Sequence, residues 1–174
     1  MSEFDLKAYI RNVPDFPLPG ILFRDITPLL HDPAAFDQAL DALSAYVAGR
    51  NPDAIVGVES RGFLFGAPIA SRLGLPFVPV RKPGKLPAAR MSVEYALEYG
   101  SNQLDIHFDA LERGQRAVIV DDVLATGGTA VAAAQLVEML GAEVAGIAFL
   151  IGLTSAEGRS KLARYDVYSL LELD

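Results

Sequence analysis

The chain has 174 residues, no cysteine and 51% hydrophobic residues, which suits one domain with a buried core and excludes a disordered chain. The absence of cysteine excludes disulfides, thiolate zinc sites and cysteine nucleophiles. The formal net charge of −7 argues against a groove for nucleic acid. No apolar run is as long as a membrane span, and residues 1–5 do not resemble a signal peptide. We therefore expect a soluble, cytoplasmic globular protein without nucleic-acid or membrane partners.

Residues 1–33 are rich in proline and turn signals, and predict an irregular segment with one short helix at 3–10. Residues 34–49 predict an amphipathic helix, because apolar side chains recur on one helical face. The residues of that face are Phe36, Leu40, Leu43 and Val47.

From residue 54 onward, predicted strands and helices alternate along the chain. The predicted elements are a strand at 54–58, a helix at 63–73 ending at Gly74, a strand at 76–80, a loop at 81–91, a hairpin of 93–99 and 103–108, a strand at 117–120, a helix at 126–140 followed by Gly141, a strand at 144–150, a helix at 156–163 and a strand at 166–170. This alternation predicts an α/β domain, with a mostly parallel central sheet flanked by helices. Two prolines, a glycine and several basic residues predict that the loop is mobile.

The segment 117–129 carries the strongest chemical signal. An apolar, β-branched strand ends at Asp121 and Asp122, and the Gly-rich turn Ala125–Thr129 then opens a helix. The N–H groups and dipole at a helix N-terminus favour phosphate, and glycines allow close approach. Two carboxylates beside a phosphate are expected to bond sugar hydroxyls or to face magnesium. The simpler alternative is that they only cap the helix.

The motif resembles the 5-phosphoribosyl-1-pyrophosphate (PRPP) signature of the type I phosphoribosyltransferases, and four more segments resemble the adenine-specific branch of that family. They are the N-terminal segment 15–28, Glu59–Phe63, the basic loop 81–87 and Leu97–Gly100. The resemblance extends from about Asp15 to the C-terminus, with the motifs in the family's order and spacing.

This resemblance implies a pentosyltransferase that moves the phosphoribosyl group of PRPP to N9 of adenine, giving AMP and pyrophosphate through an oxocarbenium-like transition state. It also implies the type I phosphoribosyltransferase fold. Residues 1–33 would form a small N-terminal hood for adenine recognition, and 34–174 a core with a lid at about 82–100. Together they would form one structural domain.

The resemblance also implies a role for each matching residue. Asp121 and Asp122 would hold the ribose, and they are the expected catalytic residues together with Arg61 and the acid/base candidate Glu98. The residues expected at the 5′-phosphate are Ala125, Thr126, Gly127, Gly128 and Thr129. Those expected at pyrophosphate are Glu59, Ser60, Arg61, Arg81, Lys85 and Tyr99, with a cis peptide between Glu59 and Ser60. Those expected at adenine are Leu22, Phe23, Arg24 and Leu153.

The family uses Mg²⁺, and the expected ion is carried mainly by PRPP and pyrophosphate, because magnesium prefers phosphate oxygens and water. A homodimer is implied as well. Three alternatives stay open at this point: a phosphoribosyltransferase for hypoxanthine, guanine, xanthine or orotate; a PRPP-sensing repressor; and a binding domain for another phosphorylated sugar.

Overall fold

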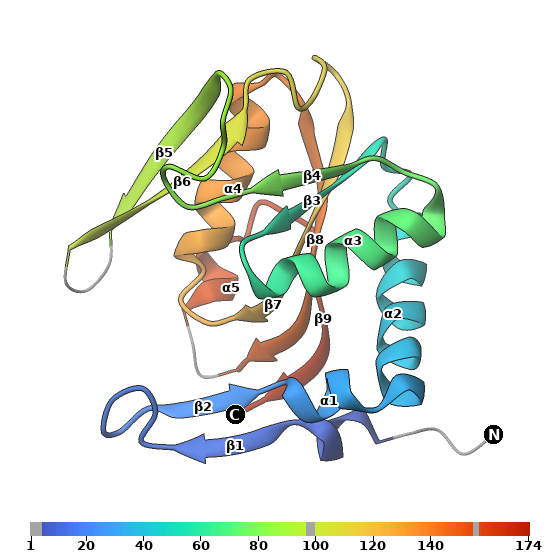
Figure 1. Ribbon diagram of the computed structural model, residues 1–174, viewed down its shortest axis with the longest axis vertical. Helices are drawn as coiled ribbons and strands as arrows, with labels where there is room; N and C mark the ends of the chain where they lie inside the picture. The colour runs from blue at the N-terminus through green and yellow to red at the C-terminus, as the bar shows by residue number, and fades with distance from the viewer. Residues whose placement is uncertain (1–4, 97–99, 155–156) are drawn as a thin grey trace. The chain divides into compact units, whose positions relative to one another are not determined.

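The computed structural model describes residues 5–96, 100–154 and 157–174. The chain forms two compact units, Met1–Ala42 and Leu43–Asp174 (Figure 1). Helix α2, Pro33–Ala48, begins in the first unit and ends in the second. Its length agrees with the amphipathic helix predicted at residues 34–49.

The first unit contains a β-hairpin that the sequence pattern did not predict. Strand β1, Arg11–Pro14, pairs antiparallel with β2, Leu22–Asp25, after the short helix η1, Leu6–Tyr9. The helix predicted at 3–10 is thus reduced to one 3₁₀ turn among the described residues. Strands of only four residues, mostly exposed along β1, carry no alternating apolar signal, which is why they were missed.

Two aspartate side chains accept backbone N–H groups at the starts of the two helices that follow this hairpin. Asp25 Oδ1 accepts the Thr27 N–H at 2.9 Å, at the start of α1, Thr27–His31. Asp32 Oδ1 accepts the N–H groups of Ala34 and Ala35 at 3.0 and 2.9 Å, at the start of α2. These carboxylates satisfy N–H groups that have no partner inside the helix.

The second unit is built on a parallel five-stranded sheet of order β4-β3-β7-β8-β9. Its strands are β3 (Ala54–Val58), β4 (Phe77–Val80), β7 (Arg116–Leu124), β8 (Glu143–Leu153) and β9 (Val167–Leu173). Its helices are α3 (Arg61–Leu73), α4 (Gly128–Met139) and α5 (Gly158–Lys161). The predicted α/β fold with a mostly parallel, helix-flanked sheet is confirmed.

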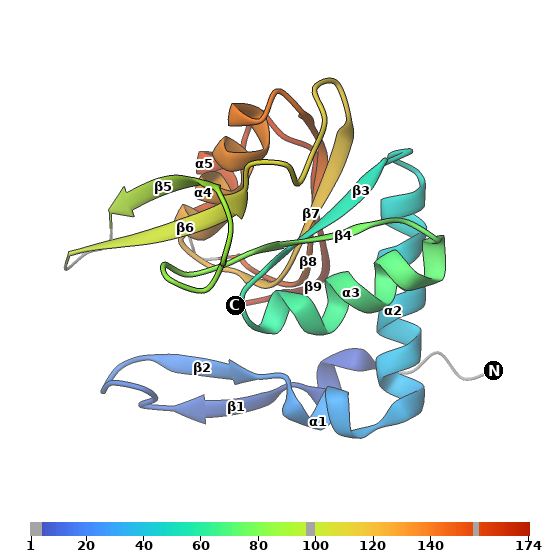
Figure 2. The ribbon, with the colours of Figure 1, turned by 45° about the horizontal axis from the view of Figure 1, so that its top comes forward.

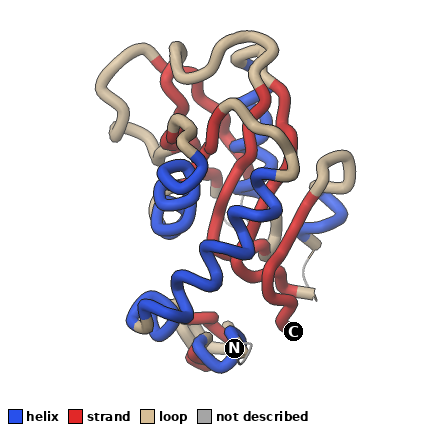
Figure 3. Tube along the Cα trace, turned by 90° about the vertical axis from the view of Figure 1, so that its right-hand side faces the viewer, coloured by secondary structure: helices blue, strands red, loops and turns tan. Residues whose placement is uncertain are grey.

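The order of the strands determines which face each helix covers. The β3–α3–β4 connection moves one way along the sheet, while β7–α4–β8 and β8–α5–β9 move the other way. Since such crossovers are right-handed, α3 lies on one face and α4 and α5 on the opposite face. The views of the ribbon and of the Cα tube agree with this arrangement (Figures 1 and 3).

The predicted hairpin is present as β5, Arg90–Ala96, and β6, Ser101–His107. It lies beside α4 (Figure 2), and one side of β5 packs on the hydrophobic core. The side chains of that side are Met91, Val93 and Tyr95. The alternation of apolar and polar residues therefore identified both the strand and its buried face.

Several predicted boundaries are wrong. The strands predicted to end at residues 150 and 170 extend to Leu153 and Leu173. Strand β7 does not end at Asp121 and Asp122 but continues to Leu124, since β8 pairs with it as far as Gly152. The helix predicted at 156–163 is a single turn, α5, among the residues described. No helix in the described part of the chain has the length and apolar character needed to cross a membrane.

Candidate active site

A cavity of about 570 Å³ opens at the carboxyl ends of β3 and β7, where ligands bind in sheets of this kind. The N-terminus of α4 and the β5–β6 hairpin complete its wall. The lining residues are Glu59, Ser60, Arg61, Lys82, Tyr95, Asn102, Leu104, Asp121, Asp122, Val123, Leu124, Ala125, Thr126, Gly127, Thr129, Ala130 and Phe149. The structure thus brings together the predicted ribose, 5′-phosphate and pyrophosphate motifs.

The two adjacent carboxylates of β7 have different partners. Asp122 is 4% exposed, and its Oδ2 lies 2.7 Å from Nε of Arg61. Asp121 Oδ1 accepts the backbone N–H of Asp122 at 2.8 Å. Burial, together with the neighbouring carboxylate of Asp122, raises the pKa of Asp121 well above its usual range. Asp122 is therefore paired with Arg61, while burial beside Asp122 makes ionisation of Asp121 less favourable.

The Gly-rich turn before α4 is packed closely against α5. Gly127 has φ +79°, and an added Cβ there would lie 2.9 Å from Cα of Gly158. Gly158 in turn donates its N–H to the carbonyl of Ala125 at 3.0 Å. The turn is therefore held in a shape that only glycine fits at residue 127, with the N-terminal N–H groups of α4 beside the cavity.

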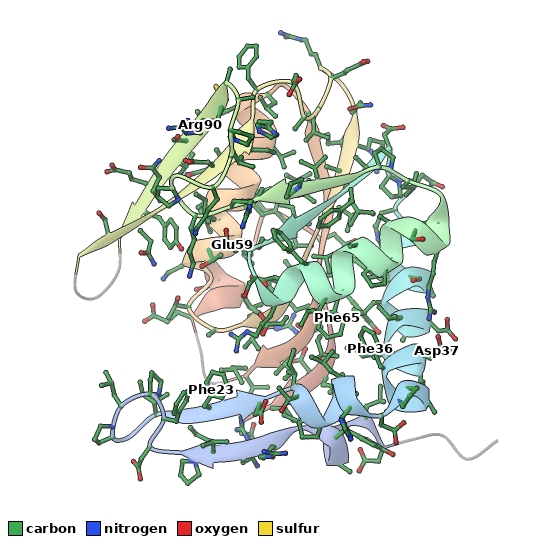
Figure 4. The ribbon with its side chains drawn as sticks, in the orientation of Figure 1. Phe23, Phe36, Asp37, Glu59, Phe65 and Arg90 are labelled. Carbon is green, nitrogen blue, oxygen red and sulfur yellow. The ribbon has the colours of Figure 1, made fainter. Side chains whose placement is uncertain are left out.

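The Glu59–Ser60 peptide is cis, as the family resemblance implies. Glu59 lies next to the end of β3 (Figure 4), and its Oε2 accepts the Arg81 Nε–H at 3.2 Å and the Lys82 N–H at 3.0 Å. This carboxylate therefore ties the end of β3 to the start of the basic loop that follows β4. The Arg81 side chain is thus bound to Glu59, and it is not among the residues that line the cavity.

The pKa of Glu59 follows from these contacts. Burial alone would raise it, but the N–H of Lys82 and the guanidinium of Arg81 bring the pKa below the ordinary value of 4.5. As the pH falls, the unfolded chain takes up this proton first. Glu59 therefore contributes stability above pH 4.5 that is lost as the pH falls through the folded-state pKa.

We expect Glu59→Gln to lower the free energy of unfolding at neutral pH by less than about 1 kcal/mol, because Arg81 is partly exposed. The variant should also lose less stability than the wild type on acidification, as measured by urea unfolding at a series of pH values. The matched control is Glu143→Gln, which removes a carboxylate that is 60% exposed and paired with Arg116. Identical pH profiles for Glu59→Gln and the wild type would contradict this assignment.

The remaining predicted residues lie elsewhere. Lys85 is exposed and accepts a hydrogen bond from Arg81 Nη1 at its carbonyl, 3.5 Å away. Leu153 is the last residue of β8. Glu98 and Tyr99 lie outside the described residues. The residues expected at adenine in the first unit form part of β2: Leu22, Phe23 (labelled in Figure 4) and Arg24.

Eight residues of the cavity wall were missing from the predicted site: Lys82, Tyr95, Asn102, Leu104, Val123, Leu124, Ala130 and Phe149. Four of them have a polar group or an aromatic ring: Lys82, Tyr95, Asn102 and Phe149. The sequence held a usable signal for two of these residues. Lys82 belongs to a cluster of basic residues, and Tyr95 lies on the side of a predicted strand that faces the core. Asn102 is paired with Tyr95 across the hairpin, and Phe149 with Asp121 across the sheet. Their positions depend on strand register, which no local pattern in the sequence specifies.

Comparison with known proteins places the chain in a family. Residues 27–174 match the family described as phosphoribosyl transferase domain. The adenine phosphoribosyltransferase of Roseiflexus castenholzii is 60% identical over 168 residues, which are 97% of this chain and 98% of that protein.

Solved structures agree with this match. The adenine phosphoribosyltransferase of Thermoanaerobacter pseudethanolicus has a TM-score of 0.95 and 56% identity, covering 97% of this chain and 98% of that one. The Saccharomyces cerevisiae enzyme, solved with adenine and an imino-altritol bisphosphate, has a TM-score of 0.92 and 43% identity, covering 96% and 97%. With the Gly-rich turn and the paired carboxylates in one cavity, these likenesses show that the chain belongs to the phosphoribosyltransferase family, among the adenine phosphoribosyltransferases.

Proposed function

We propose that this chain transfers the 5-phosphoribosyl group of PRPP to N9 of adenine, releasing pyrophosphate and forming AMP. The observation that carries the proposal is the meeting, in one cavity, of a helix N-terminus, a carboxylate pair and the cations of Arg61 and Lys82. The first suits a phosphate, the second a ribose and the third a pyrophosphate leaving group. Adenine as the acceptor is supported by relatives named adenine phosphoribosyltransferase, which match this chain over nearly its whole length.

The ribose and its 5′-phosphate are assigned to the segment 121–129. Ionised carboxylates of Asp121 and Asp122 accept hydrogen bonds from the 2′ and 3′ hydroxyls. Their negative charge would also stabilise the positive charge that develops on the sugar ring in the transition state. The 5′-phosphate would bind the backbone N–H groups and hydroxyls of the turn Ala125–Thr129.

Pyrophosphate is assigned to the loops after β3 and β4. Arg61 has a planar guanidinium that suits two phosphate oxygens, and it lies at the cavity together with Lys82 and Ser60. Glu59 would act on pyrophosphate through its backbone, since its carboxylate is bonded to Arg81 and Lys82. We also propose that Arg81 and Lys85 supply positive charge to the pyrophosphate and that Tyr99 contacts it.

Adenine recognition is assigned to Leu22, Phe23 and Arg24, with the Phe23 ring stacking on the base and main-chain groups of its neighbours reading the Watson–Crick edge. Leu153 is proposed as a further contact with the base. Within the first unit, the rings of Phe16 and Phe23 meet in a T-shaped arrangement, with centroids 5.1 Å apart. Residues 1–33 would thus act as the adenine-binding hood, and the 82–100 segment as the lid of the core.

The described residues fit a magnesium ion that arrives with the substrate. Asp121 and Asp122 offer carboxylate oxygens at the cavity. Magnesium keeps several water and phosphate ligands and needs few from protein. When bound, it would neutralise charge on PRPP and on the leaving pyrophosphate.

Two further proposals concern the cell and the assembly. We propose that the protein works in the cytoplasm, which is consistent with a chain that has no cysteine. We also propose that it forms a homodimer, on the strength of the family resemblance. Light scattering of the purified protein would test the dimer directly.

The proposed function is tested by an assay of nucleotide formation that requires both PRPP and magnesium. Adenine should give AMP, while hypoxanthine and guanine should give little or no product. Turnover with another base would keep the PRPP part of the proposal and reject adenine. PRPP binding without turnover on any base would favour the regulatory alternative.

We expect Glu98→Gln to lower kcat by about 100-fold with little change in PRPP affinity. A carboxyl group at this position would exchange the proton that adenine must lose from its ring. The measurement is steady-state kinetics with both substrates, beside PRPP binding by calorimetry. Glu94→Gln, an exposed carboxylate on β5, is the matched control. Unchanged turnover in Glu98→Gln would remove Glu98 from the acid/base role.

A further inference from the structure

A tyrosine of the β5–β6 hairpin contacts the predicted 5′-phosphate site. The hydroxyl of Tyr95 lies 3.2 Å from Oγ1 of Thr129, a hydrogen-bond distance. The ring of Tyr95 also lies against Gly128, where an added Cβ would come within 3.3 Å of Cδ2. Both Tyr95 and Thr129 line the cavity. The hairpin therefore reaches the first turn of α4 through one aromatic side chain.

The direction of this hydrogen bond matters for a bound phosphate. A hydroxyl has one proton to donate and two lone pairs to accept with. If Tyr95 donates to Thr129, the proton of Thr129 is free to point at a phosphate oxygen. An ionised phosphate is a strong acceptor, and each bond in such a chain polarises the next. A phosphate at the N-terminus of α4 would therefore strengthen the contact between Tyr95 and Thr129.

The position of Tyr95 on the hairpin adds a second consequence. Tyr95 pairs with Asn102 of β6, and both residues line the cavity. Along the chain, Tyr95 comes three residues before Glu98. A contact that strengthens when phosphate binds would therefore hold β5 in place at the point where the chain leads toward the acid/base candidate.

We propose that Tyr95 is a positioning residue for the 5′-phosphate. Its hydroxyl directs the Thr129 proton toward that phosphate and couples the β5–β6 hairpin to occupancy of the site. The inference rests on the proposed phosphoribosyl transfer. It adds a residue and a role to that proposal, namely sensing of the 5′-phosphate by the hairpin.

The test is the binding of ribose 5-phosphate, measured by calorimetry, to the wild type and to Tyr95→Phe. This change removes one hydroxyl and keeps the ring that packs on Gly128. We expect affinity to fall about 3- to 10-fold, the effect of one lost hydrogen bond, with pyrophosphate affinity and the KM for adenine unchanged. The KM for PRPP should rise by a similar factor.

The matched control is Tyr165→Phe, which deletes a hydroxyl bonded to Glu138 Oε1 at 3.0 Å. Thr129→Val provides the coupling test, since Tyr95→Phe should have no further effect on affinity in that background. Equal ribose 5-phosphate affinity in Tyr95→Phe and the wild type would overturn the inference. So would additive losses in the double variant, or a loss of the same size in Tyr165→Phe.

The experiments distinguish rejection of the role of Tyr95 from rejection of the proposed function. If the wild type turns over PRPP and adenine while Tyr95→Phe behaves like it, only the role of Tyr95 is rejected. If the wild type binds neither ribose 5-phosphate nor PRPP, the proposed function is rejected together with this inference.

Discussion

Replacing Asp121 and Asp122 together by asparagine is expected to lower kcat/KM for PRPP by about 100-fold or more. Each change keeps the shape of the side chain but removes a negative charge and one acceptor oxygen. The ribose hydroxyls lose charged acceptors, and the developing positive charge on the sugar loses its stabilisation. Binding and turnover should therefore weaken together, which steady-state kinetics and PRPP titration measure separately.

The two single variants should differ in how strongly they lower kcat/KM for PRPP. Asp122→Asn also removes the charge from the 2.7 Å ion pair with Arg61 and leaves that cation without its carboxylate, so it should have the larger effect. Asp121→Asn keeps an oxygen that accepts the Asp122 N–H. The control is Asp53→Asn, another carboxylate that accepts a backbone N–H, that of Arg116 at 2.8 Å. Near-normal kinetics in the double variant would mean that the two carboxylates have only a structural role at the end of β7.

Asp121 should also affect how stability depends on pH. Because its pKa in the folded protein is raised above the ordinary 3.8, the folded state holds this proton more tightly than the unfolded state. The wild type therefore loses stability as the pH rises from 3.8 through the raised pKa. Asp121→Asn does not titrate, so it should be more stable than the wild type at neutral pH while being less active. Urea unfolding at neutral pH tests this, and a less stable variant would contradict it.

Gly127→Ala is expected to raise the KM for PRPP by about 100-fold, because a left-handed backbone costs a residue with a Cβ about 1–2 kcal/mol and the new atom would also meet Gly158. The distance from the added Cβ to Cα of Gly158 would be 2.9 Å. The atoms that the Cβ would meet in Gly158 belong to the backbone, so the backbone itself must move. The N–H groups offered to the 5′-phosphate then lose their alignment.

The control for this variant is Gly74→Ala at the end of α3. Gly74 has φ +65° and open space where a Cβ would be added. The same conformational cost should therefore lower stability without changing the KM for PRPP. Thermal unfolding and steady-state kinetics of the two variants separate strain from site geometry. An unchanged KM in Gly127→Ala would show that the shape of the turn is not required for PRPP binding.

Several parts of the fold were predictable because they depend on neighbours in sequence. Strand β3 was predicted with its observed bounds, since all five of its residues are apolar or glycine and are buried. The end of α3 followed from Gly74, which has the left-handed conformation that commonly ends a helix. The Gly-rich turn after a buried strand likewise predicted that a helix, α4, begins close behind it. These signals are local, so periodicity and composition reveal them.

Other features were decided only by the tertiary structure. The β1–β2 hairpin was missed because its strands are short and mostly lack alternation. Strand β7 continues past Asp122 because β8 offers a paired edge as far as Gly152. The partners within the site come from segments far apart in sequence: Arg61 for Asp122, Arg81 for Glu59 and Tyr95 for Thr129.

There is a physical reason why some features could be predicted from the sequence and others were decided only by the tertiary structure. The residue types of the site and the order of its elements are written in the sequence, because strand, turn and helix form from nearby residues. The pairing of charges and hydroxyls depends on strand register and on the face that each helix covers. Those are set when the sheet assembles and the buried side chains pack, so the sequence determined which groups are available and the tertiary structure decided which of them meet.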